Sequence, residues 1–162
     1  MMEIVYRSIG IIHSPFTELA GMPIQPAGAV GVVGTAVLQP EFTPGLQDLD
    51  GFSHIILLYH LHRVAAISLT VTPFLDTQPR GVFATRAPKR PNPIGLSVVK
   101  LVRVEQNVLH LENVDILDGT PLLDVKPYVP EFDHQPEIRT GWLAKAQGQV
   151  QNKKSDDRFY DG

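Results

Sequence analysis

The chain has 162 residues, a mixed composition and a formal net charge of −3 at pH 7, which favour one globular domain without a general attraction to nucleic acid. It contains no cysteine, which excludes disulfides, thiolate metal sites and cysteine nucleophiles. The first residues lack the apolar core of a signal peptide, and no apolar run is long enough to cross a bilayer, so we expect a cytoplasmic protein with no membrane partner.

The N-terminal third predicts short strands separated by proline-containing loops. Residues 5–12 alternate weakly between apolar and polar side chains and predict a first strand. Residues 16–28 contain two prolines and no periodicity, which indicates a loop, and the β-branched residues of 30–38 predict a second strand. Thr43 as N-cap, followed by Pro44, predicts one short helical turn.

The strongest strand signal covers residues 52–64, whose first part is apolar on both faces and therefore predicts a strand buried on both sides. Five further strands are expected, at residues 67–74, 82–85, 96–104, 108–114 and 122–128. Residues 140–149 predict a short helix, and the polar tail after residue 150 is expected to fray.

Seven or so short strands with few short helices predict a mainly β fold, a single small β-barrel domain. Periodicity alone does not separate a barrel from a sandwich. We find no internal repeat and no linker between domains. We therefore expect a barrel domain over residues 1–140, followed by a C-terminal helix or tail over residues 141–162.

A stiff basic loop is predicted within residues 81–95. Three prolines lie in this run: Pro88, Pro91 and Pro93. Each proline fixes its own φ and pushes the preceding residue toward extended backbone, so Arg86, Lys89 and Arg90 should be presented with little chain freedom. Such a loop suits an anion. The alternative is a proline-rich surface turn that happens to be charged.

Three histidines could form a metal site. His60 and His62 are two residues apart on a predicted strand and point to one face, and His54 is nearby. A cupin-like site would need a following glutamate and a second histidine cluster, and neither is present, so we expect no metal. The alternative is one buried, hydrogen-bonded histidine and one in water.

Two aspartates bracket a predicted turn. Asp118 and Gly119 are typical of a tight turn, in which glycine supplies a positive φ, and Asp115 precedes them at the end of a strand. Beside this structural use, the carboxylates suit a cationic or hydroxyl-rich ligand at the end of a barrel. The sequence has no phosphate loop, dinucleotide fingerprint or serine-hydrolase elbow.

Several sequence blocks occur in a fixed order along the chain. They are residues 51–54 (GFSH), 81–86 (GVFATR), 90–97 (RPNPIGLS), 115–121 (DILDGTP) and 126–130 (KPYVP), with IGIIHSP at 9–15 and QP at 25–26. Together they resemble the TsaA/TrmO-like family over roughly residues 4–130. The resemblance implies a β-barrel that binds S-adenosylmethionine, forms a homodimer and methylates N6 of threonylcarbamoyl-adenosine beside the tRNA anticodon.

The resemblance also implies a set of site residues. Carried over by motif, the cofactor contacts are Gln25, Pro26, His60, Arg86, Leu96, Asp115, Ile116, Leu117, Asp118, Gly119 and Thr120. A guanidinium suits the cofactor's carboxylate, aspartates suit its ammonium or ribose, and apolar side chains suit its adenine. His60, whose ordinary pKa is near neutrality, is the candidate general base. The candidate substrate contacts are Lys89, Arg90 and Asn92.

Two other functions remain open at this point. One is a non-catalytic module that binds S-adenosylmethionine or RNA. The other is a metal-dependent, cupin-like enzyme built on His54, His60 and His62.

Overall fold

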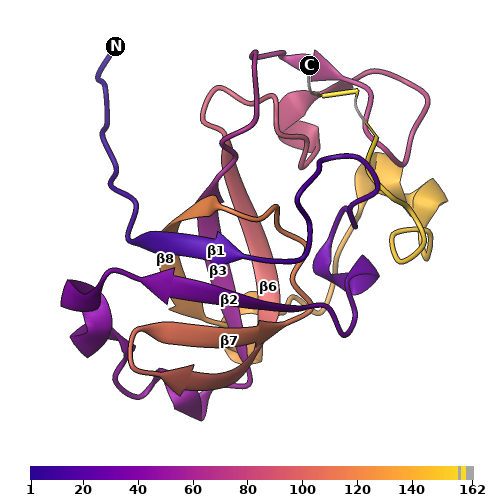
Figure 1. The fold of residues 1–162 in the computed structure, drawn as a ribbon. Helices are drawn as coiled ribbons and strands as arrows, with labels where there is room; N and C mark the ends of the chain where they lie inside the picture. Colours follow the sequence, from indigo (N-terminus) through magenta and orange to yellow (C-terminus); the bar gives the residue numbers. More distant parts are fainter. Residues whose placement is uncertain (157, 160–162) are drawn as a thin grey trace.

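Six antiparallel strands close into a barrel in the order β1-β2-β7-β6-β3-β8 (Figure 1). They are β1 (Gly10–His13), β2 (Val33–Leu38), β3 (His54–His60), β6 (Ile94–Glu105), β7 (Val108–Glu112) and β8 (Thr120–Pro127). This computed structural model describes residues 1–156, 158 and 159. The prediction of a mainly β fold with one small barrel and few short helices is confirmed, and a closed barrel replaces the sandwich alternative.

The barrel is filled by alternate side chains of its strands. In β3, Ile55, Leu57 and Tyr59 are buried, and the residues between them are only partly covered. The same alternation in the other strands completes one apolar core, with Ile12, Leu109 and other aliphatic side chains fully buried. The predicted burial of both faces of this strand is therefore wrong for its outer face.

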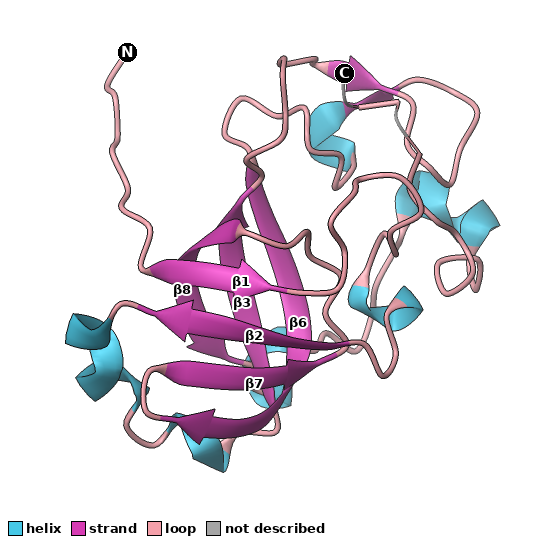
Figure 2. Ribbon diagram, viewed as in Figure 1, coloured by secondary structure: helices cyan, strands magenta, loops and turns pink. Residues whose placement is uncertain are grey.

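The remaining elements lie outside the barrel wall (Figure 2). A two-stranded sheet consists of β4 (Thr70–Val71) and β5 (Arg80–Gly81). The helices are all short: 3-10 helices η1 (Pro26–Gly28), η2 (Pro40–Leu46), η3 (Leu49–Gly51), η4 (Val82–Ala84) and η5 (Gly141–Ala146), and one α-helical turn, α1 (Pro130–Asp133). Among the described residues, none of these helices has the length and apolar character needed to cross a membrane.

Several predicted elements differ from the observed ones. The strand expected at 82–85 is the 3-10 helix η4, and the strand expected at 67–74 is only the two residues of β4. The helical turn near Thr43 exists, but η2 begins at Pro40 with Gln39 as N-cap, and the Thr43 hydroxyl donates back to the Pro40 carbonyl oxygen at 2.7 Å.

The two ends of the chain behave differently from each other. Of the strand expected at 5–12, only residues 10–12 belong to β1, which ends at His13, and the N-terminal residues extend away from the barrel (Figure 1). The tail after residue 150 is expected to fray, but its described part packs against the loops, and Phe159 is buried with Val71, Val82 and Ala87. Residues 151–156, 158 and 159 therefore form part of the folded body, and the rest of the predicted tail, 157 and 160–162, lies outside the described residues.

Candidate functional site

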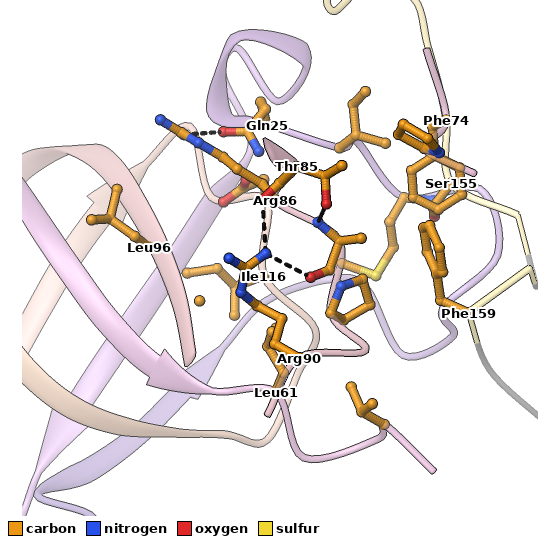
Figure 3. Close-up of a pocket in the computed structure, with 18 of the residues that line it drawn as sticks. Gln25, Leu61, Phe74, Thr85, Arg86, Arg90, Leu96, Ile116, Ser155 and Phe159 are labelled. Carbon is orange, nitrogen blue, oxygen red and sulfur yellow. Dashed lines mark hydrogen bonds between the residues drawn. The ribbon is translucent and has the colours of Figure 1, made fainter. Parts of the chain in front are cut away.

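A cavity of about 770 Å³ lies between one end of the barrel and the loops and C-terminal segment that cover it. Its volume falls within the range typical of small-molecule sites. Figure 3 shows its lining, in which Leu96 and Ile116 come from the barrel side, Arg86 and Arg90 from the loop, and Ser155 and Phe159 from the C-terminal segment.

The barrel side of the cavity contains a buried polar chain. The Tyr59 hydroxyl lies 2.8 Å from Ser97 Oγ, and Ser97 Oγ donates to Asp115 Oδ1 at 2.7 Å. Tyr59 reaches this position by lying across Gly95, its pairing partner on β6. A Cβ atom on Gly95 would stand 2.1 Å from the Tyr59 ring, so only glycine leaves room for the ring. The glycine of the RPNPIGLS block is thus required at this position for a steric reason.

The Asp115 carboxyl group is buried. Burial raises its pKa to about 6, although the Ser97 hydrogen bond and the charge of Arg86 work in the opposite direction. Asp115 and Arg86 both line the cavity, so a potential anion and a cation stand in the same lining. Such a pair suits a ligand that carries both charges.

Arg86 is fixed from a distant part of the chain. Its Nη1 donates to Gln25 Oε1 at 2.9 Å (Figure 3), and Gln25 is the N-cap residue of η1. Both side chains line the cavity. The contact holds the guanidinium toward the lining and leaves its other N–H groups available to an anion.

Arg90 braces the loop. Its Nη1 donates to the carbonyl oxygens of Val82, Thr85 and Ala87 at 3.0, 2.7 and 3.2 Å. The guanidinium thereby ties η4 to the proline-containing turn. Arg90 therefore has a structural use that the sequence did not indicate, in addition to lining the cavity.

The C-terminal segment forms a wall that sequence reasoning missed. Ser155 forms four hydrogen bonds with the chain at 19–22, two through its hydroxyl and two through its backbone. Trp142 Nε1 donates to the Ala84 carbonyl oxygen at 2.7 Å, and Phe159 packs edge-on against Phe74. The one signal available was composition, because Trp142 is the only tryptophan in the chain.

The structure gathers many of the predicted site residues in the one cavity. Those that line it are Gln25, Arg86, Arg90, Leu96, Asp115, Ile116, Leu117 and Thr120. Those outside the lining are Pro26, His60, Lys89, Asn92, Asp118 and Gly119.

Asp118 has a structural partner instead. Its Oδ1 accepts from the Ser14 backbone N–H at 3.1 Å and lies 3.1 Å from His13 Nδ1. The neighbouring Gly119 has a φ of 80°, as the predicted turn requires. In the DILDGT block, therefore, some residues line the cavity, and Asp118 instead bonds to the residues at the end of β1.

The three histidines do not form a cluster. His54 and His60 stand at opposite ends of β3, and His60 is exposed. His62 lines the cavity, where partial burial, then the charge of Arg63, then His60, lower its pKa. No group of three metal-ligating side chains occurs in the part of the chain that the structure describes, so nothing there supports the cupin-like alternative.

The comparisons with known proteins agree on one family. Residues 11–134 match the family model described as the tRNA-methyltransferase O N-terminal domain. A Pyrococcus abyssi protein named "Probable S-adenosyl-L-methionine-binding protein" is 54% identical over 159 residues, which cover 98% of this chain and 86% of that protein.

Longer proteins match as well. The human tRNA (adenine(37)-N6)-methyltransferase is 35% identical over 145 residues, covering 84% of this chain and 32% of that protein. The crystal structure of TrmO from Pseudomonas aeruginosa superposes with a TM-score of 0.74 and 40% identity, covering 87% of this chain and 63% of that one. The chain thus spans less than two thirds of these longer proteins.

Proposed function

Because the chain belongs to the tRNA-methyltransferase O N-terminal domain family, we propose that it is an S-adenosylmethionine-dependent methyltransferase acting on N6 of threonylcarbamoyl-adenosine beside the tRNA anticodon. The observation that carries the proposal is the cavity in which Arg86 and Asp115 lie among apolar side chains. The names of the relatives support it, since they include both S-adenosyl-L-methionine-binding proteins and tRNA (adenine(37)-N6)-methyltransferases.

The residues of the cavity fit the cofactor chemically. Arg86 offers a guanidinium to a carboxylate, and Asp115 offers a carboxylate to an ammonium. Leu96 and Ile116 offer apolar surface to an adenine. When bound, S-adenosylmethionine supplies a methyl group activated by its sulfonium, so the protein has mainly to align the two reactants.

The acceptor nitrogen must also lose a proton. The predicted base, His60, is exposed at the end of β3 and outside the lining, whereas His62 lines the cavity. The lowered pKa of His62 favours its neutral form, which can accept a proton at a ring nitrogen. We therefore favour His62 for this role. We expect His62→Ala to lower turnover while cofactor affinity is kept, and His60→Ala to have the smaller effect; the reverse order would restore His60.

The experiment that tests the proposal measures binding and transfer separately. Calorimetry with S-adenosylmethionine should give saturable binding to the wild-type protein and a much weaker signal for Arg86→Ala. Arg103→Ala, an exposed arginine of β6 outside the lining, is the matched control and should bind normally. Mass spectrometry of tRNA that bears threonylcarbamoyl-adenosine should then show one added methyl group.

A binding module without transferase activity is the second candidate. It is favoured by the names of the archaeal relatives, one of which, from Archaeoglobus fulgidus, is an "S-adenosyl-L-methionine-binding protein" that is 40% identical over 129 residues. Cofactor binding by calorimetry together with unchanged tRNA would select this candidate. Normal affinity of the Arg86→Ala protein would reject the proposed cofactor site in both cases.

We also propose a homodimer working in the cytoplasm, where tRNA is modified. Exposed apolar residues support self-association: Ile4, Val5 and Tyr6 lie in the extended N-terminal segment, and Ile94 and Leu96 lie at the edge of the cavity. Sedimentation analysis should give twice the chain mass. A monomer at working concentration would reject the dimer without affecting the cofactor proposal.

A further inference from the structure

The chain next to the cavity is positively charged, although the protein as a whole is negative. Residues 60–94 contain five of the 14 Lys and Arg residues and one of the 17 Asp and Glu residues. That single acid, Asp76, is paired with Arg80 at 2.6 Å. Arg63, Arg86 and Arg90 from this segment line the cavity. The surface around the opening therefore complements a polyanion.

An aromatic ring stands exposed within this basic segment. Phe83 lines the cavity, yet 74% of its surface is accessible. The Arg90 guanidinium carbon lies 5.8 Å from the centre of the Phe83 ring. An arginine beside an exposed aromatic ring is the combination with which proteins bind unpaired nucleobases.

The ring is held on a rigid support. The residue before it, Val82, is buried, and the Val82 carbonyl oxygen accepts from both Arg90 Nη1 and the Thr85 backbone N–H. The Val82 backbone N–H donates to Leu69. Because η4 is fixed on both sides, little backbone freedom remains at Phe83 to be lost on binding.

Phe83 is also not a solitary exposed residue. Ile67 and Leu69 are each more than 60% exposed, and hydrogen bonds of the 68–69 backbone to Val82 and Lys89 bring them beside the loop. Single exposed apolar residues are ordinary, but a group of them next to a cavity indicates a contact surface.

We propose that Phe83 is a stacking platform for a nucleobase of a single-stranded RNA loop that enters the cavity opening. This rests on the proposed function, and it adds a residue for RNA recognition that is distinct from the cofactor contacts. Arg90 lies beside the ring and Arg63 lines the same cavity, and both complement the phosphates of the same RNA strand.

The test compares three replacements of Phe83 with a matched control. Phe83→Ala and Phe83→Leu remove the aromatic face, and Phe83→Trp keeps it. Phe132→Ala removes a phenylalanine that is equally exposed, at 73%, but belongs to α1 outside the cavity. The readouts are affinity for a single-stranded anticodon-loop oligonucleotide, KM for tRNA, and S-adenosylmethionine affinity by calorimetry.

We expect Phe83→Ala and Phe83→Leu to weaken RNA binding about tenfold, the usual effect of removing one stacking ring, and to raise KM for tRNA. Phe83→Trp and Phe132→Ala should remain near wild type. Normal RNA binding by Phe83→Leu would overturn the proposal, because apolar contact would then suffice. Equal losses of RNA and cofactor affinity would also overturn it, because Phe83 would then line the cofactor site. Conversion of a dimer to a monomer by these variants would overturn it as well.

Failure of the proposed function gives a different pattern. If the wild-type protein leaves tRNA unmethylated but the Phe83 series still orders RNA affinity by aromatic character, the platform stands and the transferase proposal falls. If wild-type protein methylates tRNA and the series is flat, the platform alone is rejected.

Discussion

The two sides of the cavity are built in opposite ways. On the barrel side, Tyr59 and Leu96 belong to paired strands, and Asp115 is held by Ser97 of β6. On the other side, the loop and C-terminal segment meet through individual side-chain bonds, such as those of Arg90 and Trp142 to carbonyl oxygens. The strand positions on the first side are fixed by a continuous hydrogen-bond ladder, to which Ser97 ties Asp115, and positions on the second side depend on a few contacts.

This difference divides the work of the site. A closed barrel holds the residues at its end at fixed spacing, which suits the Asp115 carboxylate and the apolar surface proposed to contact a small cofactor, while Arg86 reaches the same cavity from the loop side. Segments held by separate contacts open more easily and vary more between relatives, which suits recognition of a larger substrate. The family model likewise ends at residue 134, before the C-terminal wall begins.

The largest expected effect is on stability, and it appears when a glycine on each side of the cavity is replaced by alanine. Gly95→Ala places a Cβ against the Tyr59 ring, so we expect a loss of about 3 kcal/mol in the free energy of unfolding. Gly81→Ala on the loop side meets nothing within 4 Å and has a φ of −58°, so its effect should be near zero. Urea unfolding measures both. Equal stability of the two variants would contradict the idea of a rigid barrel side.

A smaller and more local effect is expected from Arg90. Arg90→Ala removes a shared donor from three carbonyl oxygens, of which that of Val82 keeps its bonds from Thr85, at a cost of about 2 kcal/mol for bonds to a charged group. Hydrogen exchange should quicken at the Thr85 amide, which is bonded to Val82, and stay unchanged at barrel amides of β3. Arg90→Lys should give an intermediate result, because an ammonium does not reproduce the planar fork. Faster exchange across the whole barrel would show that the two sides unfold together.

The sequence predicted the barrel side far better than the other. Alternation of apolar residues carries the information for strands, and β2, β3, β6, β7 and β8 all lie within or close to the predicted ranges. At residues 82–85 the same apolar character gave a wrong prediction of a strand. Hydrogen bonds from the Arg90 and Thr85 side chains to the Val82 carbonyl oxygen stabilise a 3-10 turn there instead. A turn fixed by distant side chains leaves no periodic signal.

The lining of the cavity could likewise be predicted from the sequence only in part. Arg86, Leu96 and Asp115 were predicted from short blocks and lie in one cavity. Trp142 and Phe159 were not predicted, because their contacts join positions 58 and 85 residues away in the sequence. The separation of Asp115 from Asp118 was also beyond the sequence, since it depends on which side of a turn each carboxylate faces.

The pH dependence of Asp115 gives the smallest effect, and it tests whether the barrel side binds a cation. Its folded-state pKa of about 6 lies above the value of about 4 usual for an unfolded chain, so the folded protein holds the proton more tightly. The contribution of this group to stability is therefore full below pH 4 and is lost as pH rises toward 6.

Binding of a ligand ammonium should change in the opposite direction, because it requires the ionised carboxylate. We expect S-adenosylmethionine affinity to fall as pH decreases through 6, and to be about tenfold weaker at pH 5 than at pH 7. Asp115→Asn should bind weakly at every pH and lose this dependence. An unchanged pH profile in that variant would assign the titration to another group, such as His62, and would leave the barrel side without its proposed cation contact.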